Sequence, residues 1–228
     1  MSQSLRIQFT VLVLVTIVLV SWGGQALAQS FPAAQNCTAT LVTPGLQPLS
    51  MFLVPNGSGT PLSGCFDSSG NTVNALINVT LRDGNNMVAA NVPASSVRLE
   101  YLNSPLAWCS SSWYPPPAHA PNLADAASNA AGQTMFSLAY HGGGWIMAPI
   151  QVWVLEVTGA WTPIPTVLNV FFNSADINGD LVVNLIDVSL FAGDYYSGTQ
   201  YRSDFNFDGA INLTDVNILA THYGTSCP

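Results

Sequence analysis

The chain has 228 residues, a formal net charge of −8 at pH 7 and only 7% charged residues. This acidity excludes nucleic acids as expected partners, because their phosphates require a basic protein surface. Seven of the twelve acidic residues lie between Asp176 and Asp215, and lysine is absent. A cation bound in that region would offset the crowding of like charges.

The first 28 residues are typical of an export signal. Arg6 provides a short basic start, residues 11–20 form an almost unbroken apolar run, and Ala26-Leu27-Ala28 fits a cleavage site. The alternative is a retained anchor, but the apolar run is shorter than the roughly 20 residues that span a bilayer. We therefore expect a secreted or cell-surface protein with no membrane span after signal cleavage.

Four cysteines follow the signal: Cys37, Cys65, Cys109 and Cys227. An even number in an exported chain predicts disulfides, and three pairings are possible. The spacing is too wide for a zinc site. Whichever partner Cys227 takes, its bridge would hold the C-terminus in place.

Residues 29–173 show the short alternation of apolar and polar residues that predicts β-strands. Strands are expected at 77–81, 97–101 and 136–140, and longer apolar runs lie at 150–158 and 166–172. Turn-forming segments separate them, which favours a β-sandwich. The expected fold class is mainly β, with a small α-helical module at the C-terminal end.

Parts of this region resemble the bacterial Ig-like domains of surface adhesins. The similar segments are Val79-Thr80-Leu81-Arg82-Asp83 with Gly84-Asn85 following, Ala124-Asp125-Ala126, and the run from Ala131 to Leu138. This resemblance implies an Ig-like β-sandwich that serves as a spacer or a binding domain.

A long loop at 106–122 departs from the Ig-like pattern and is rich in Trp, Tyr and Pro. Its Trp108, Trp113 and Tyr114 suggest two interpretations. They form an exposed platform for a ligand such as a polysaccharide, or they fold into the core at the end of the sandwich. The second interpretation is favoured, because large aromatic side chains are on average well buried.

Two patterns suggest catalysis, and each has a simpler structural explanation. The segment 141–144, His-Gly-Gly-Gly, matches an esterase oxyanion-hole motif, but the G-x-S-x-G nucleophile elbow that it requires is absent. We predict a hairpin turn there. The second pattern is the pair of glutamates, Glu100 and Glu156, which are the only two in the chain and could in principle be the two carboxylates of a glycosidase. Glu156 follows a strand pattern and is expected to point outward, so we expect no enzymatic activity.

A duplicated pattern of oxygen-bearing side chains occupies 176–187 and 204–215. Asp or Asn falls at positions 1, 3, 5, 9 and 12 of each copy, the spacing with which an EF-hand-type loop surrounds a hard cation. We name these segments loop 1 and loop 2. The pattern predicts two calcium sites.

Each loop runs into a predicted helix with one apolar face. The two faces repeat with a shift of 28 residues and comprise Leu185, Val188, Phe191, Ala192 and Tyr195, then Leu213, Val216, Leu219, Ala220 and Tyr223. We expect the two helices to bury these faces against each other. Neither loop follows the entering helix of an EF-hand, because 167–172 is strand-like and 197–199 is typical of a linker.

The region from about 174 to 224 resembles a type I dockerin, whose signature is a duplicated D-x-N-x-D-G-x-x-N-x-x-D loop followed by a helix. The resemblance implies two bound calcium ions and docking to a cohesin-like partner. The implied ligands are Asp176, Asn178, Asp180, the carbonyl of Val182, Asn184 and Asp187 in loop 1, and Asp204, Asn206, Asp208, the carbonyl of Ala210, Asn212 and Asp215 in loop 2.

Two features depart from the dockerin pattern. Position 6 is Leu181 in loop 1 where Gly209 stands in loop 2, and a non-glycine residue at positive φ is costly. Loop 2 is therefore predicted to be the better calcium site. Positions 10 and 11 are Leu185-Ile186 and Leu213-Thr214 instead of the Ser-Thr pair of cellulosomal dockerins, so a cellulosomal cohesin is not the implied partner.

These expectations combine into a signal at 1–28, an Ig-like sandwich at 29–173 and a dockerin-like module at 174–228. The expected function is that of a secreted, non-enzymatic calcium-binding protein. Its module would dock to a cohesin-like partner or mediate self-association. The alternative is a carbohydrate-binding sandwich that the dockerin tethers.

Overall fold

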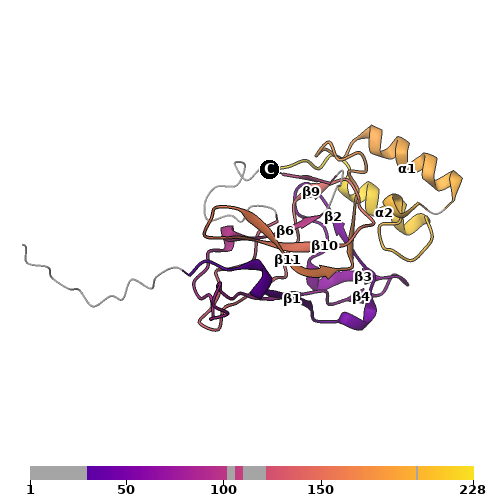
Figure 1. Cartoon of the computed structure of the whole chain (residues 1–228). Helices are drawn as coiled ribbons and strands as arrows, with labels where there is room; N and C mark the ends of the chain where they lie inside the picture. The colour runs from indigo at the N-terminus through magenta and orange to yellow at the C-terminus, as the bar shows by residue number, and fades with distance from the viewer. Residues whose placement is uncertain (1–29, 102–105, 110–121, 199) are drawn as a thin grey trace, which may run out of the picture.

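The computed structural model describes residues 30–101, 106–109, 122–198 and 200–228. The predicted export signal, Trp113 and Tyr114 lie outside these residues. The described part is mainly β, as expected, and its two α-helices both lie near the C-terminus (Figure 1). None of its helices is long and apolar enough to cross a membrane.

The strands are β1 (Thr38–Leu41), β2 (Leu49–Leu53), β3 (Cys65–Asp67), β4 (Thr72–Val73), β5 (Ile77–Thr80), β6 (Val97–Tyr101), β7 (Ala107–Trp108), β8 (Gln133–Phe136), β9 (Gly142–Gly143), β10 (Ile150–Leu155), β11 (Trp161–Leu168) and β12 (Val170–Ser174). The helices are α1 (Leu185–Ser197) and α2 (Leu213–His222). Short 3₁₀ helices are η1 (Ala34–Asn36), η2 (Pro44–Leu46), η3 (Leu62–Gly64), η4 (Ala94–Ser96) and η6 (Tyr201–Ser203).

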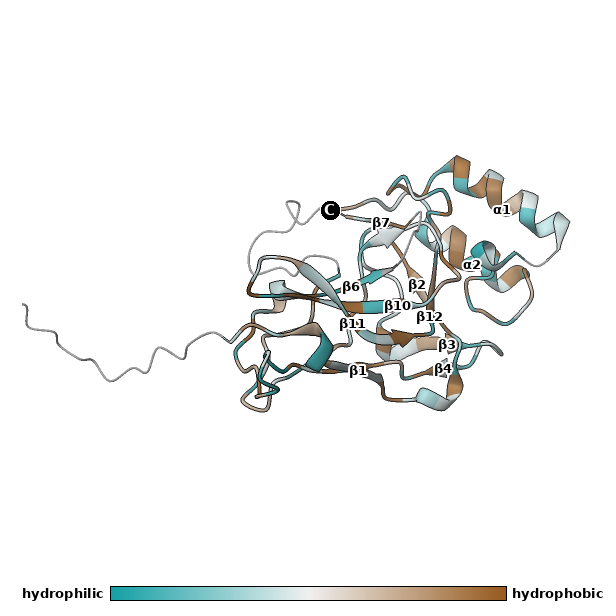
Figure 2. Ribbon diagram, viewed as in Figure 1, coloured by the Kyte–Doolittle hydropathy of each residue, from teal (hydrophilic) through white to brown (hydrophobic). Residues whose placement is uncertain are grey.

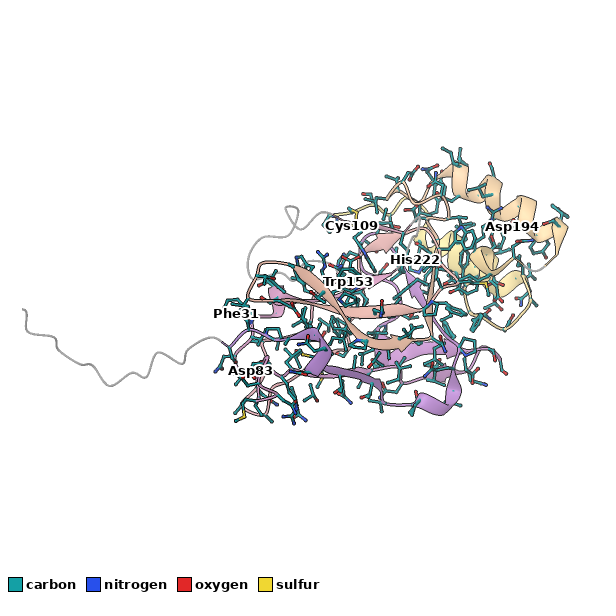
Figure 3. The ribbon with its side chains drawn as sticks, in the orientation of Figure 1. Phe31, Asp83, Cys109, Trp153, Asp194 and His222 are labelled. Carbon is teal, nitrogen blue, oxygen red and sulfur yellow. A yellow bond between two sulfur atoms is a disulfide. The ribbon has the colours of Figure 1, made fainter. Side chains whose placement is uncertain are left out.

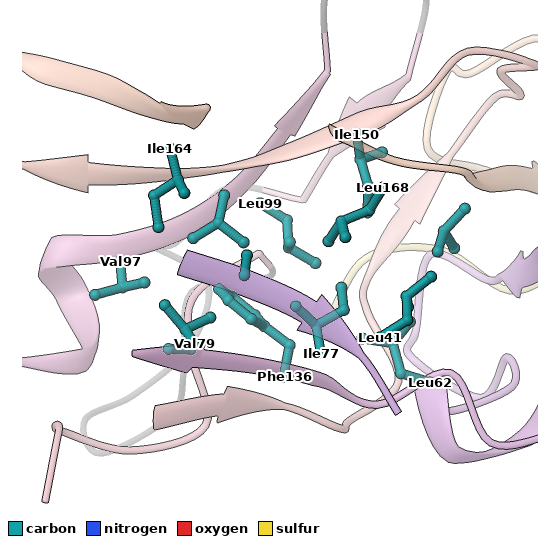
Figure 4. Close-up of a cluster of buried hydrophobic side chains, with 14 of the residues drawn as sticks. Leu41, Leu62, Ile77, Val79, Val97, Leu99, Phe136, Ile150, Ile164 and Leu168 are labelled. Atoms are coloured by element: carbon teal, nitrogen blue, oxygen red, sulfur yellow. The ribbon is translucent and has the colours of Figure 1, made fainter. Parts of the chain in front are cut away.

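Two antiparallel sheets, ordered β1-β5-β8 and β11-β10-β6, enclose the larger core. In β5, Ile77 and Val79 are fully buried and the intervening Asn78 is exposed, as the alternating sequence predicts. Figure 4 shows Ile77 and Val79 directed toward Leu99 and Ile150 of the other sheet. The layered β architecture is thus present, and the finer Ig-like assignment stays a prediction.

A third, mixed sheet has the order β12-β2-β3-β4, and its β2 and β12 run parallel from Val170↔Leu49 to Ser174↔Leu53. All five residues of β2 are buried, and the strand is largely apolar (Figure 2). Because both faces of β2 are covered, it lacks the apolar–polar alternation by which the strands at 77–81, 97–101 and 136–140 were predicted. The sequence pattern therefore does not predict this strand.

Two predicted strands have different limits in the structure. The strand expected at 136–140 instead occupies Gln133–Phe136 and shares only Phe136 with the expected range. It ends there because the next amide, Ser137 N–H, donates to Asp125 Oδ1 at 3.2 Å and leaves the ladder. The run expected at 166–172 is divided at Asn169, where the chain leaves β10 and begins to pair with β2. Asn169 contributes its carbonyl to Leu49 N–H at 3.0 Å.

A smaller core joins the C-terminal module to the β domain. Phe205, fully buried in loop 2, has its ring centroid 5.3 Å from Phe52 of β2 and 5.7 Å from Phe191 of α1. Because β12 ends at Ser174 and loop 1 begins at Asp176, only Ala175 separates the strand from the loop. The module therefore shares its core with the sheet beneath it.

One disulfide, Cys109–Cys227, links the residue after β7 to the C-terminal tail (Figure 3). It holds the C-terminus, as predicted for any bridge of Cys227. The expectation that all four cysteines pair is wrong, because Cys37 and Cys65 are free and buried. The Cys37 thiol donates to the Ala33 carbonyl at 3.2 Å, and Cys65 is fully buried as a small side chain of the core.

Candidate metal centre

Loops 1 and 2 lie between the β domain and the two helices. Loop 1 follows β12, and loop 2 follows the 3₁₀ helix η6. Each loop ends in an α-helix, as expected. Asn184 and Asn212 are the N-caps, and each forms a capping box with the aspartate three residues later, Asp187 or Asp215.

The first aspartate of each loop is surrounded by backbone amides. Asp176 Oδ1 accepts from Gly179 N–H at 2.9 Å, and its Oδ2 accepts from Leu181 N–H at 2.7 Å. In loop 2, Asp204 accepts from Gly209 N–H at 2.9 Å in the same way. The backbone therefore wraps around the position-1 carboxylate in both loops.

The last aspartate of each loop closes the ring from the helix side. Asp187 accepts from Asn178 N–H at 3.1 Å and from Asn184 N–H at 2.9 Å. In the second copy, Asp215 accepts from Phe205 N–H at 2.8 Å and from Asn212 N–H at 2.9 Å. Asp187 and Asp215 are both fully buried, so the first turn of each helix is tied to its loop.

The remaining predicted ligands of loop 1 converge on Asp180. The amides of Asn178 and Asn184 lie 2.9 Å and 3.3 Å from Asp180 Oδ2, and the Asn184 amide also lies 3.0 Å from the Val182 carbonyl oxygen. Rotation of either amide about its last side-chain bond presents an oxygen at the same point. The structure therefore brings these four groups together.

Loop 2 repeats this arrangement. The amides of Asn206 and Asn212 lie 2.9 Å and 3.3 Å from Asp208 Oδ2, and Asn212 lies 3.4 Å from the Ala210 carbonyl oxygen. The predicted duplication thus extends from the sequence to the hydrogen-bond pattern.

Buried negative charge accumulates in both loops. Burial raises the pKa of Asp176 to about 6, and the charges of Asp187 and Asp180 raise it further against the hydrogen bonds from the loop backbone. Burial likewise raises the pKa of Asp204 to about 6, with Asp215 and Asp208 adding to the effect. A cation among these carboxylates would favour their charged forms.

The donor set of each loop fits a hard cation. Carboxylate, amide and carbonyl oxygens are the groups that Ca²⁺ takes in proteins, and a Ca²⁺ site has six to eight of them. Within the described ranges, no group of three or more His, Cys, Asp or Glu side chains is placed to hold a metal. Amide and carbonyl oxygens would therefore have to complete the coordination, and calcium binding stays a prediction.

Backbone strain does not rank the two loops as predicted. Positions 4 and 6 both have positive φ: Gly179 at 75° and Leu181 at 71° in loop 1, and Phe207 at 56° and Gly209 at 83° in loop 2. Each loop thus has one glycine and one side-chain-bearing residue in this region, where the latter costs about 1–2 kcal/mol. The predicted ranking rests on position 6 alone, whereas Phe207 at position 4 places the same kind of strain in loop 2.

The four-residue stretch 141–144 has a different role from the hairpin turn that was predicted. Gly142 and Gly143 form β9, which pairs with β7, and the Gly144 N–H donates to the carbonyl of Asp176 at 2.6 Å. The glycines thus connect the β domain to loop 1. A sequence pattern cannot reveal this contact, because it joins segments more than 30 residues apart.

The two glutamates are not placed as a pair. Glu100 forms an ion pair with Arg98 at 3.0 Å, and Glu156 Oε1 accepts from Ala34 N–H at 2.9 Å. Glu100 lies opposite Gln151 in the ladder, five residues from Glu156. This corresponds to roughly 16 Å of strand, whereas glycosidase carboxyls lie about 5–9.5 Å apart.

Of the three aromatic residues considered as a ligand platform, only Trp108 lies within the described residues. It packs against the larger core, and its ring makes edge-to-face contacts with Tyr140 and Phe172, with ring centroids 6.2 Å and 6.1 Å away. This position agrees with the interpretation in which the aromatics fold into the core.

The helix faces are exposed, contrary to the expectation that they bury each other. Phe191 and Leu219 are buried, but Leu185 is 67% and Leu213 74% exposed. The reason is that Phe191 and Leu219 pack into the smaller core with Phe52 of β2 and Phe205 of loop 2. The remaining apolar side chains of the two faces are left exposed or only partly buried.

Between the two helices lies an open groove of about 610 Å³, which we name the helix groove. Its lining consists of Val188, Phe191, Ala192, Tyr195, Tyr196, Leu213, Val216, Leu219, Ala220 and Tyr223. None of these side chains is charged, so the groove is an apolar surface with tyrosine hydroxyls as its only side-chain polar groups.

Comparison with known proteins finds no family model that matches the chain, and no match among curated proteins or solved structures. The dockerin-like and Ig-like resemblances therefore rest on the residues quoted above.

Proposed function

We propose that residues 174–228 form a calcium-dependent docking module of a secreted, non-enzymatic protein. The single observation that carries the proposal is the helix groove, an exposed apolar surface whose two walls begin inside the metal loops. Leu185 precedes the last predicted ligand of loop 1 by two residues, and Leu213 stands in the same relation to Asp215. Ordering of the two loops would therefore fix the positions of the two groove walls.

The exposure of the groove supports binding to another protein. Tyr196 is 89% exposed, and Leu185 and Leu213 are similarly open to solvent. A contiguous apolar surface of this kind on a soluble protein marks an interaction site more often than a chance cluster of side chains. Tyrosine is also among the residue types enriched at protein interfaces.

The proposed occupant is a cohesin-like partner protein at the cell surface, as the dockerin resemblance implies. Removal of the predicted signal, which contains Arg6, would leave each copy with a formal charge of −9, and two bound Ca²⁺ ions would reduce it to −5. Long-range repulsion would therefore still oppose the association of two copies. A different protein with an apolar patch is therefore favoured over self-association, which is the alternative outcome of the test.

Calorimetric titration with Ca²⁺ tests the metal sites, and uptake of two ions is expected. Replacement of the central aspartate in one loop, Asp180→Ala or Asp208→Ala, should leave one site. Absence of calcium uptake by the wild-type protein would contradict the proposal. N-terminal sequencing of the exported protein should begin at Gln29, the residue after the predicted cleavage site.

Capture of surface proteins on the immobilised chain tests docking. We expect one captured partner that chelation of calcium releases. The Leu213→Glu variant, which places a charge in the groove, should fail to capture it. The matched control is Met147→Glu, because Met147 is an exposed apolar residue outside the groove, and it should retain the partner. Capture that is indifferent to both chelation and Leu213→Glu would overturn the proposal, whereas calcium-dependent dimers in light scattering would replace the partner by self-association.

A further inference from the structure

The β domain contacts the first predicted ligand of loop 1 at its backbone and its side chain. Gly144 N–H donates to the Asp176 carbonyl at 2.6 Å. A Cβ atom added to the neighbouring Gly143 would lie 1.7 Å from Asp176 Oδ2 and 2.6 Å from its Cγ. Only glycine therefore fits at 143 while the Asp176 carboxylate keeps its place.

Loop 2 has an equivalent contact from a different part of the β domain. Gly70, in the β3–β4 turn, has φ +76°, and a Cβ there would lie 2.8 Å from Asp208 Cβ. Asn173 of β12 holds the first residue of the loop, because its side-chain amide donates to the Asp204 carbonyl at 2.6 Å. Each loop is thus held at its first residue and contacted closely by one glycine.

The C-terminal tail completes the enclosure of loop 1. Val183 N–H donates to the Thr225 carbonyl at 2.8 Å, and Val182 pairs with Ser226. The next residue, Cys227, is bound through its disulfide to Cys109 beside β7, and β7 pairs with β9. A continuous set of contacts therefore runs from loop 1 through the tail and the β7–β9 pair back to Asp176.

We propose that the β domain is a structural part of both metal sites, with Gly143 and Gly70 as positioning residues for Asp176 and Asp208. Neither glycine supplies a ligand. Gly143 lets the β domain approach the Asp176 carboxylate, and Gly70 lets it approach the Cβ of Asp208, so each contact limits the movement of one ligand residue. A ligand held in advance binds with less loss of conformational entropy. This inference rests on the proposed calcium function.

Four glycine-to-alanine variants form a matched experiment. Gly143→Ala places a methyl group against Asp176, and its control is Gly84→Ala, which has neither positive φ nor any atom within 4 Å of the new Cβ. Gly70→Ala combines positive φ with contact at Asp208, and its control is Gly159→Ala, at φ +79° with open space around it. The strain of positive φ is thus separated from the contact with the loop.

Calcium titration should show that Gly143→Ala and Gly70→Ala each weaken one of the two sites by at least tenfold. The controls should bind both ions as the wild-type protein does. To identify the affected site, Gly143→Ala is combined with the single-loop variants. Added to Asp180→Ala, in which loop 1 is already disabled, Gly143→Ala should not change calcium uptake any further. Added to Asp208→Ala, in which loop 1 is the remaining site, it should weaken calcium binding.

Hydrogen exchange on the wild-type protein gives a second test that does not depend on the folding of any variant. Calcium should increase protection of the amides at 107–109 and 142–144, and should leave the turn around Gly84 unchanged. Wild-type affinity in Gly143→Ala, or unchanged protection at both β segments, would overturn the inference while calcium uptake stands. Absence of uptake by the wild-type protein would instead be a failure of the proposed function.

Discussion

Arg202 donates two hydrogen bonds to the Asp194 carboxylate, from Nε to Oδ2 at 2.6 Å and from Nη2 to Oδ1 at 2.7 Å. Ser203 adds a third hydrogen bond to the same carboxylate at 2.6 Å. Asp194 belongs to the last turn of α1 (labelled in Figure 3), and Arg202 and Ser203 belong to η6 just before loop 2. This contact therefore ties the helix of the first repeat to the loop of the second.

Replacement of Arg202 by Gln should lower the free energy of unfolding by about 2 kcal/mol, because it removes the two guanidinium hydrogen bonds to the buried Asp194 carboxylate. The matched control is Arg82→Gln, which removes a hydrogen bond to the Asn86 carbonyl in an exposed turn. We expect that control to change stability by less than about 0.5 kcal/mol. Chemical denaturation measures both, and equal effects would contradict a special role for the Asp194 pair.

The same pair predicts a pH dependence. Burial acts to raise the pKa of Asp194, but the hydrogen bonds from Arg202 and Ser203 outweigh it and hold the pKa below its ordinary value. Stability from a carboxyl with a lowered pKa is present above its unfolded-state pKa of about 3.9 and is lost as the pH falls through the folded-state value. The stability difference between wild type and Asp194→Asn should stay constant from about pH 8 to pH 5 and shrink below about pH 4. A difference that grows on acidification would refute this assignment.

Phe205→Ala should destabilise the protein by about 3–5 kcal/mol, because the ring is fully buried between Phe52 and Phe191 and its loss leaves a cavity. Tyr196→Ala removes an aromatic ring that is 89% exposed and serves as the control. Denaturant unfolding followed by circular dichroism compares the two. If the Phe205 variant were no less stable than the Tyr196 variant, the shared core of the module and the β domain would not hold the two parts together.

After oxidation the protein should contain one disulfide and two buried thiols. A thiol reagent should find no reactive group in the folded chain and two per chain after unfolding without reductant. Burial raises the pKa of both the Cys65 and the Cys37 thiols, which lowers the reactive thiolate fraction in the folded state. Absence of thiols after unfolding would indicate a second bridge and would contradict the free state of this pair.

Much of the local structure could be predicted because its causes are local. The spacing of Asp and Asn in the two loops is reproduced in the convergence of their side chains, and Asn184 and Asn212 begin the predicted helices as N-caps. The alternation around Ile77 and Val79 likewise follows from one buried sheet face.

The remainder depends on contacts that no local pattern encodes. The apolar faces of α1 and α2 were expected to meet, but Phe191 and Leu219 instead complete a core with β2. The importance of Gly143 becomes visible only when Asp176 is placed beside it. Position 4 of the loops escaped notice because Gly179 and Phe207 differ in type although their backbone conformation is shared.

The direct passage of β12 into loop 1 has a mechanical consequence for a protein anchored through its C-terminal module. A partner that pulled on the helix groove would transmit force through loop 1 to β12, which five residue pairs join to β2. The Cys109–Cys227 bridge adds a covalent path for the same force. Tension on the module would thus reach β2, a strand whose five residues are all buried.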